Sequence, residues 1–196
     1  GTVRADSFSG IPPEKVAAFY VPRMTKSPTI DGFINPEEWQ EATAISGVGQ
    51  QTDALLVPRP TTFFLGWDPG HIYFAVRVYV RKGDKPHVPA GRSQNLAYVW
   101  DDGMELHWKP MGKNQPDKNV SYKWFENCLG FIGDCSRIAL GQQFKNWGPK
   151  FQIKTRITEP VTAPNGGSWW ELEMSSTPKD FELTGPHQLG DQWRMM

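Results

Sequence analysis

Apolar and polar residues alternate over residues 104–108, and this alternation restricts the fold of the chain more than any other feature. The apolar positions are Met104, Leu106 and Trp108. Glu105 and His107 lie between them. Because successive side chains of a β-strand point to opposite faces of the sheet, we expect one face to pack on the core and the other to display a carboxylate and an imidazole.

The residues before this strand favour a change of direction. Asp101-Asp102-Gly103 is a poor strand-forming sequence, so we expect a loop or a bulge where the strand begins. Trp100 lies one residue earlier and has the parity of the core residues. A bulge at this position would turn its ring toward the outer face, beside Glu105.

Short alternating segments recur along the chain. They cover residues 63–68, 72–80, 121–127, 151–157, 169–174 and 193–196. The 19 glycines and 17 prolines are numerous enough to supply the turns between them. Short helices are expected after the N-cap Asn35 and at residues 178–181. Many short strands without a βαβ rhythm predict an all-β fold, an antiparallel β-sandwich with short peripheral helices.

The same pattern suggests a domain division. Residues 1–27 are mixed in composition, and we expect an N-terminal arm there. Residues 28–196 are expected to form one β-sandwich domain, which is large enough for a substantial core. The chain begins with Gly1 rather than methionine, which is compatible with export and removal of a signal peptide.

Charge and hydropathy argue against two classes of partner. The chain has 21 acidic and 21 basic residues, and the basic residues form no cluster. Nucleic-acid phosphates call for clustered Lys and Arg, so we expect no nucleic-acid partner. No apolar run approaches the roughly 20 residues of a membrane helix, so we expect no membrane partner. Nine tryptophans indicate either an aromatic core or rings that face a ligand.

Two cysteines, Cys128 and Cys135, lie close together in the sequence. In an oxidising compartment they could form a disulfide that stabilises the fold by roughly 2–3 kcal/mol, and in a reducing cell they would be two thiols. No second pair of Cys or His lies at zinc-binding spacing, so a zinc site is not expected. The strand register decides whether the two sulfur atoms can meet.

Five sequence motifs occur in a recognisable order. They are Ile30-Asp31-Gly32 with Glu38-Trp39, Leu65-Gly66-Trp67-Asp68 with the strand 72–78, Trp100-Asp101-Asp102-Gly103-Met104-Glu105-Leu106, the aromatic strand 122–130 around Asn127, and Trp170-Glu171-Leu172-Glu173-Met174 with Trp193-Arg194. From about Ile30 to its end the chain therefore resembles the family 9 carbohydrate-binding modules and their relatives. The resemblance implies a β-sandwich and a non-catalytic, sugar-binding function. The family continues past its Trp-Arg strand, so we expect the domain to be truncated at its C-terminal end.

The resemblance also implies where a sugar would bind. Sugars have apolar C–H faces and a ring of hydroxyl groups, so an aromatic platform binds the first, and carboxylates, amides and imidazoles bind the second. Trp100 is the predicted platform, and Glu105 matches a carboxylate that contacts sugar in the family. The other predicted hydroxyl-binding residues are Asp101, His107 and Asn127.

The expected protein is thus an accessory module of an exported glycan-degrading protein, either extracellular or periplasmic. Its expected partners are a mono- or oligosaccharide or the end of a polysaccharide, together with other domains of a longer protein. No catalytic residue and no cofactor are predicted, although the family uses calcium structurally. A structural or docking β-sandwich that binds no sugar is the main alternative.

Two further functions fit less well. A glycosidase needs two carboxyl groups roughly 5–9.5 Å apart, and the candidates are Asp101, Glu105, Glu171 and Glu173. Some relatives of the fold hold haem between a methionine and a histidine or lysine. Met104 and His107 are expected on opposite faces of one strand, so they would not ligate the same iron.

Overall fold

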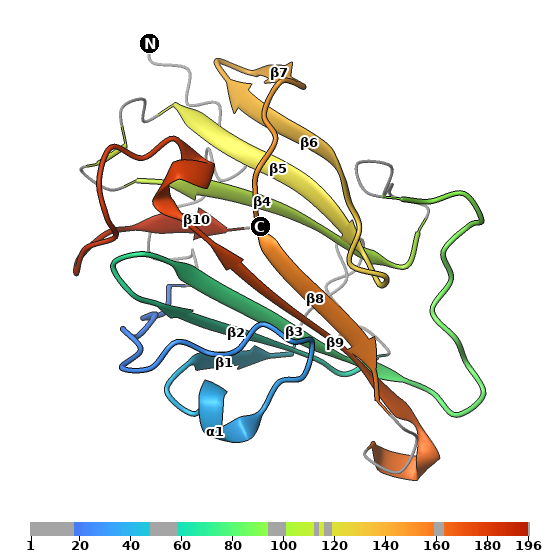
Figure 1. Ribbon diagram of the computed structural model, residues 1–196. Coiled ribbons are helices and arrows are strands. Elements are labelled where there is room, and N and C mark those ends of the chain that lie inside the picture. Colours follow the sequence, from blue (N-terminus) through green and yellow to red (C-terminus); the bar gives the residue numbers. More distant parts are fainter. Residues whose placement is uncertain are drawn as a thin grey trace.

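The computed structural model describes residues 18–47, 59–93, 101–111, 114–115, 119–158 and 163–195, and these form two five-stranded sheets packed face to face (Figure 1). The strand pairs of both sheets are antiparallel. Helices are short and lie outside the sheets. The predicted antiparallel β-sandwich with short peripheral helices is confirmed.

The first sheet has the strand order β1-β2-β3-β9-β8. Its strands are β1 (Thr43–Ser46), β2 (Thr61–Trp67), β3 (Ile72–Val80), β9 (Ser168–Ser176) and β8 (Gln152–Ile157). The second sheet has the order β10-β4-β5-β6-β7. Its strands are β10 (Trp193–Met195), β4 (Gly103–Pro110), β5 (Val120–Asn127), β6 (Ile132–Ala139) and β7 (Gln142–Phe144). Both sheets therefore combine strands that are distant in the sequence.

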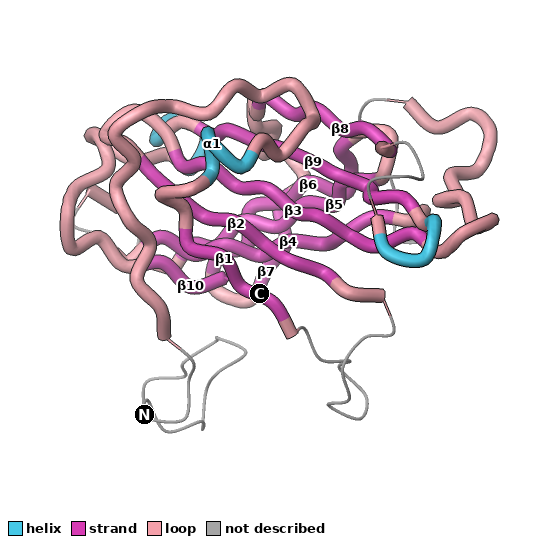
Figure 2. Tube along the Cα trace, turned by 90° about the horizontal axis from the view of Figure 1, so that it is seen from below, coloured by secondary structure: helices cyan, strands magenta, loops and turns pink. Residues whose placement is uncertain are grey.

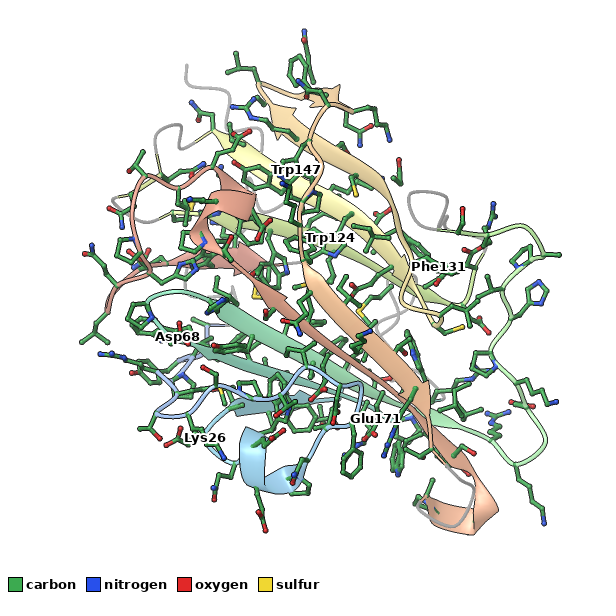
Figure 3. All side chains as sticks on the ribbon, viewed as in Figure 1. Lys26, Asp68, Trp124, Phe131, Trp147 and Glu171 are labelled. Carbon is green, nitrogen blue, oxygen red and sulfur yellow. The ribbon has the colours of Figure 1, made fainter. Side chains whose placement is uncertain are left out.

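Large aromatic side chains fill the space between the sheets. Trp108 packs against Phe74 of the opposite sheet, with ring centroids 6.0 Å apart, and against Trp124 at 5.2 Å. Figure 3 shows Trp124 and Trp147 pointing into this interior. The buried tryptophans are Trp39, Trp108, Trp124, Trp147 and Trp170. The sequence left open whether the tryptophans form an aromatic core or face a ligand, and in the structure most of the described ones lie in the core.

The segment 18–42 covers the outer face of the first sheet, as Figure 2 shows for its helix α1 (Pro36–Trp39). The Asn35 side chain caps this helix, as predicted, by accepting a hydrogen bond from the Glu37 amide. A second apolar cluster lies beneath the segment. It consists of Met24, Ile30, Ile34, Trp39, Tyr73 and Ala75.

Glu173 of β9 joins two of the five sequence motifs. Its carboxylate accepts hydrogen bonds from the backbone amides of Asp31 and Gly32, at 2.9 and 2.8 Å, and from Trp39 Nε1 at 2.7 Å. Gly32 has a φ of +90°, and a Cβ there would lie 3.0 Å from the backbone of Thr155. The motifs therefore fix the covering segment to the sheet.

The second sheet carries a carboxyl group in the core. Glu126 of β5 has the inward parity of Trp124 and is fully buried. Neither of its carboxyl oxygens has a hydrogen-bond partner among the described residues. Burial raises its pKa to about 8, so the neutral acid is the form that the fold favours.

A buried imidazole lies in the loop before β10. The His187 ring packs against Trp193, with centroids 5.8 Å apart, and the residue is only 4% exposed. The described residues offer no hydrogen-bond partner to either ring nitrogen. Burial lowers its pKa to about 4, because the charged form would lose its hydration.

The two cysteines are free thiols, so the disulfide considered from the sequence is not formed. In the β5–β6 ladder Cys135 stands opposite Trp124, whereas Cys128 lies in the turn beyond the end of β5. Four residues of strand separate these positions by roughly 13 Å. A disulfide needs Cα atoms within about 7 Å, so the register prevents it.

Thiol titration tests this arrangement. Burial raises the pKa of both thiols to about 11, so we expect slow reaction with a disulfide reagent in the folded protein. Unfolding without a reductant should then release both thiols of each chain. A chain that yields none until a reductant is added would contradict the observed register.

In the described part of the chain, no helix has the length and apolar character needed to cross a membrane.

Candidate functional site

Glu105 and His107 point away from the core on the outer face of the second sheet. Leu106 and Trp108, which alternate with them on β4, belong to the core between the sheets. The predicted division of β4 into an apolar and a polar face is therefore confirmed. The expected loop before the strand is also present, because β4 begins at Gly103 after a bend at Asp101 and Asp102.

Five charged or titratable side chains form a continuous row across this face, and we call them the charged row. Its members are His107, Glu105, Lys123, Asp134 and Lys145. His107 Nε2 lies 2.9 Å from Glu105 Oε1, and Lys123 Nζ lies 3.1 Å from Glu105 Oε2. Lys123 Nζ also donates to Asp134 Oδ2 at 2.7 Å, and Lys145 Nζ contacts the other oxygen of Asp134.

Strand register brings these residues together. His107 on β4 pairs directly with Lys123 on β5, so both side chains lie on the same face. On β6 the register shifts, so that Asp134 and Cys135 together stand opposite Trp124. Asp134 has a φ of +48°, and this bulge places its carboxylate beside Lys123.

Both carboxylates of the charged row are held in the ionised form. Partial burial of Glu105 favours the neutral acid, but hydrogen bonds from His107 and Lys123 outweigh it and hold the pKa below its usual value. For Asp134, burial is likewise outweighed by Lys123 and Lys145, and its pKa is also lowered. The pKa of Lys123 is raised, because its two carboxylate partners outweigh its burial. The row therefore has fixed charges at neutral pH.

The charged row retains hydrogen-bonding capacity for a ligand. An ionised carboxylate offers about four lone-pair positions, and an ammonium group has three N–H donors. Glu105 uses its oxygens for one contact each with His107 and Lys123. The remaining lone pairs can accept hydrogen bonds from hydroxyl groups. Hydrogen bonds to a charged group are stronger than those between two neutral groups.

Asp101 and Asn127, two predicted ligand residues, are buried beside one another. Asn127 Nδ2 donates to Asp101 Oδ2 at 2.9 Å, and Arg92 Nε donates to Asp101 Oδ1 at 2.7 Å. Asn127 Oδ1 accepts from the amides of Leu129 and Phe131, at 3.1 Å each. The structure thus uses these side chains to hold the β5–β6 turn and the loop before β4 together. It does not place them in the charged row.

Trp100, the predicted aromatic platform, lies outside the described residues, which resume at Asp101. Among the described residues, the charged row itself contains no aromatic ring other than the imidazole of His107.

Sequence reasoning missed Lys123, Asp134 and Lys145. Lys123 could have been found, because it alternates with Tyr122 and Trp124 in an amphipathic strand. Asp134 gives no such signal, since its position depends on a bulge that only the β5–β6 register reveals.

A pocket of about 310 Å³ opens between the sheets on the other side of β4. Its lining is mostly apolar and includes Phe63, Val76 and Met104, together with the charged residues Arg59 and Asp102. Glu105 and His107 point away from it. Because its walls offer few hydrogen-bonding groups, it suits hydroxyl-rich ligands less well than the charged row does.

The other predicted chemistries find little support in the geometry. Glu173 is bound to the covering segment, and Glu171 accepts from Arg77 Nε at 2.7 Å; both belong to the other sheet. Met104 packs against the core, whereas His107 faces outward. No three Cys, His, Asp or Glu side chains in the described ranges gather as metal ligands would.

Comparisons with known proteins give similarity in structure but not in sequence. No model of a protein family matches the chain. A search of curated proteins finds no match either. A family 9 carbohydrate-binding module from Caldicellulosiruptor kristjanssonii, solved with glucose, has a TM-score of 0.52 at 15% identity, over 89% of this chain and 75% of that one. A putative carbohydrate-binding protein from Bacteroides uniformis has a TM-score of 0.53 at 17% identity, over 89% and 79% of the two chains.

At these identities the similarity concerns the fold. The resemblance to family 9 modules that the five motifs indicated is confirmed at that level, over nearly nine-tenths of the chain. The two sheets and the scarcity of helix agree with it.

Proposed function

We propose that this protein is a non-catalytic carbohydrate-binding module, and that the charged row on the outer face of the second sheet is its binding site. The observation that carries the proposal is the exposed Glu105–His107 pair, whose Oε1 and Nε2 atoms are 2.9 Å apart and whose carboxylate also contacts Lys123. The pair lies on a fold that is similar to that of a module solved with glucose. Sugar binding needs several fixed hydrogen-bonding groups that accept and donate to adjacent hydroxyls. Glu105 supplies acceptors and Lys123 supplies an N–H donor, while neutral His107, whose Nε2–H donates to Glu105, offers Nδ1 as a further acceptor.

The electrostatics of the row support binding rather than catalysis. Lys123 Nζ lies 3.1 Å from Glu105 and 2.7 Å from Asp134, so these carboxylates are close enough for a glycosidase pair, which needs roughly 5–9.5 Å. Such a pair also needs one protonated carboxyl group as the general acid, with a raised pKa. The pKa of each of these two carboxyl groups is lowered instead.

The proposal extends to the context of the module. We also propose that the module belongs to an exported protein, extracellular or periplasmic, where enzymes that degrade structural polysaccharides meet their substrates. Its natural partners would be a glycan and the catalytic domain that acts on it.

Isothermal titration calorimetry tests the proposal. The wild-type protein should release heat with at least one sugar from a panel of glucose, xylose, mannose and their β-1,4-linked oligomers. Glu105→Gln keeps the size of the side chain but removes its charge, and it should weaken binding by about tenfold or more. Glu37→Gln on α1, on the opposite side of the molecule, is the matched control and should bind like the wild type.

Two outcomes would count against the proposal. Absence of heat with every sugar of the panel would favour a structural or docking domain, the main alternative. Equal binding by Glu105→Gln and the wild type would place the site elsewhere.

A further inference from the structure

The pocket between the sheets is built from the inner faces of both sheets, at the start of β4. Thr61 on β2, Val78 on β3 and Trp170 on β9 line it from the first sheet, and Met104 on β4 lines it from the second. Val78 pairs with Thr61 on one side and with Trp170 on the other. Because paired residues share a face of the sheet, these side chains form one continuous wall.

The size of the pocket sets it apart from ordinary packing defects. Protein interiors are packed as densely as organic crystals, and they contain few voids larger than a water molecule. This pocket has a volume of about 310 Å³. An apolar cavity of about 150 Å³ is enough to bind benzene. The pocket is therefore large enough for a molecule with one or two aromatic rings.

The apolar part of the lining favours an aromatic ligand over an aliphatic one. Phe63 and Trp170 present aromatic rings to the pocket, and contacts between rings add an attraction beyond that of the buried area. Met104 adds a thioether, whose sulfur makes favourable contacts with ring edges. Val76 and Val78 are β-branched and stiff at χ1, so this wall keeps its shape when a ligand binds.

The charged residues of the lining indicate which polar group the ligand carries. Arg59 Nη2 lies 3.6 Å from Asp84 Oδ2, so the charge of Arg59 is balanced. Asp102 Oδ2 accepts a hydrogen bond from the His87 amide at 2.7 Å. A carboxylate has about four lone-pair positions, so that of Asp102 can accept a further hydrogen bond. A hydroxyl group matches this acceptor, whereas a ligand carboxylate would be repelled by it.

We propose that the pocket binds a neutral aromatic molecule of one or two rings that carries a hydroxyl group, that is, a phenol. The ring system contacts Phe63, Trp170 and Met104. The hydroxyl group donates a hydrogen bond to the carboxylate of Asp102. The charged row lies on the other face of β4, so this inference does not depend on the proposed sugar binding.

Titration with 2-naphthol, followed through the methyl NMR signals of valine and methionine, tests the proposal. The signals of Val76, Val78 and Met104 should shift together and give a dissociation constant of roughly 10 µM to 1 mM. 2-Methoxynaphthalene has the same rings but no O–H donor. It should bind about tenfold more weakly, because a hydrogen bond to a charged acceptor is lost. 2-Naphthoate should also bind more weakly than 2-naphthol.

Three variants locate the site. Val78→Phe fills part of the pocket and should weaken 2-naphthol binding about tenfold or more. Ile138→Phe is the matched control and should bind like the wild type, because Ile138 pairs with Ser121 on the outer face of the second sheet. Asp102→Asn should bring the affinities for 2-naphthol and 2-methoxynaphthalene close to each other, since the charged acceptor is removed.

The comparison of the three ligands needs only the wild-type protein, so it holds even if a variant folds poorly. Absence of shifts with 2-naphthol, or binding by Val78→Phe equal to that of the wild type, would overturn the site. Equal affinity for 2-naphthol and 2-methoxynaphthalene would overturn the role of Asp102. Tighter binding of 2-naphthoate than of 2-naphthol would overturn the choice of a neutral ligand. None of these results bears on sugar binding by the charged row.

Discussion

Glu173→Ala is expected to lower the free energy of unfolding by roughly 3–5 kcal/mol. The substitution leaves three donors without their acceptor, namely the amides of Asp31 and Gly32 and the indole Nε1 of Trp39. All three belong to the segment that covers the first sheet, so its apolar cluster should also loosen. Denaturant unfolding monitored by tryptophan fluorescence measures the loss.

Two comparisons make this result specific. Glu173→Gln keeps one oxygen acceptor and should lose less stability than the alanine variant. Gln152→Ala, at an exposed position of the neighbouring strand β8, should change stability by less than about 0.5 kcal/mol. If Glu173→Ala is as stable as Gln152→Ala, Glu173 does not hold the covering segment.

Stability is expected to fall by about 2 kcal/mol between pH 6.5 and pH 8, because Glu126 is buried as a neutral acid. Its pKa rises from 4.5 in the unfolded chain to about 8 in the fold. The folded state therefore binds the proton more tightly, and this contribution is complete below pH 4.5 and lost as the pH rises to 8. Glu173, whose pKa burial also raises, acts in the same direction.

His187 has the opposite effect in a lower pH range. Its pKa falls from 6.5 in the unfolded chain to about 4 in the fold, so its contribution is complete above pH 6.5 and lost as the pH falls to 4. Between pH 4.5 and 6.5 the effects of Glu126 and His187 oppose each other. The decline due to Glu126 should therefore be visible above pH 6.5.

Glu126→Gln tests this assignment. The variant should remove most of the decline between pH 6.5 and 8 and should expose the loss due to His187 below pH 6.5. Denaturant midpoints measured at intervals from pH 4 to pH 9 give both slopes. A wild-type protein whose stability is constant or increases from pH 6.5 to 8 would contradict the buried neutral carboxyl.

The fold could be predicted because the local sequence patterns agree with the strands and the helix that the structure contains. Alternation in β3, β4 and β9 identified the inward and outward faces, and Asn35 marked the start of α1. The motif residues Gly32, Trp39 and Glu173 indicated a family before any contact between them was known. Their role became clear only in the structure, where they are joined by hydrogen bonds.

The site could be predicted only in part, because it depends on contacts between strands. Glu105 and His107 lie two residues apart on one strand, so periodicity alone places them on the same face. Lys123 joins them through the pairing of β4 with β5, and Asp134 through a bulge that no sequence signal marks. β5 has a second charged residue, Glu126, whose side chain points to the face opposite to that of Lys123. The sequence did not reveal that its carboxyl group lies in the core.

The most direct test of the sugar-binding site is a map of backbone amide chemical shifts during titration with the tightest-binding sugar of the panel. The largest shift changes are expected in β4, β5 and β6, around Glu105, His107 and Lys123. Largest changes in α1, β2 or β3, or no changes at saturating sugar concentrations, would contradict it.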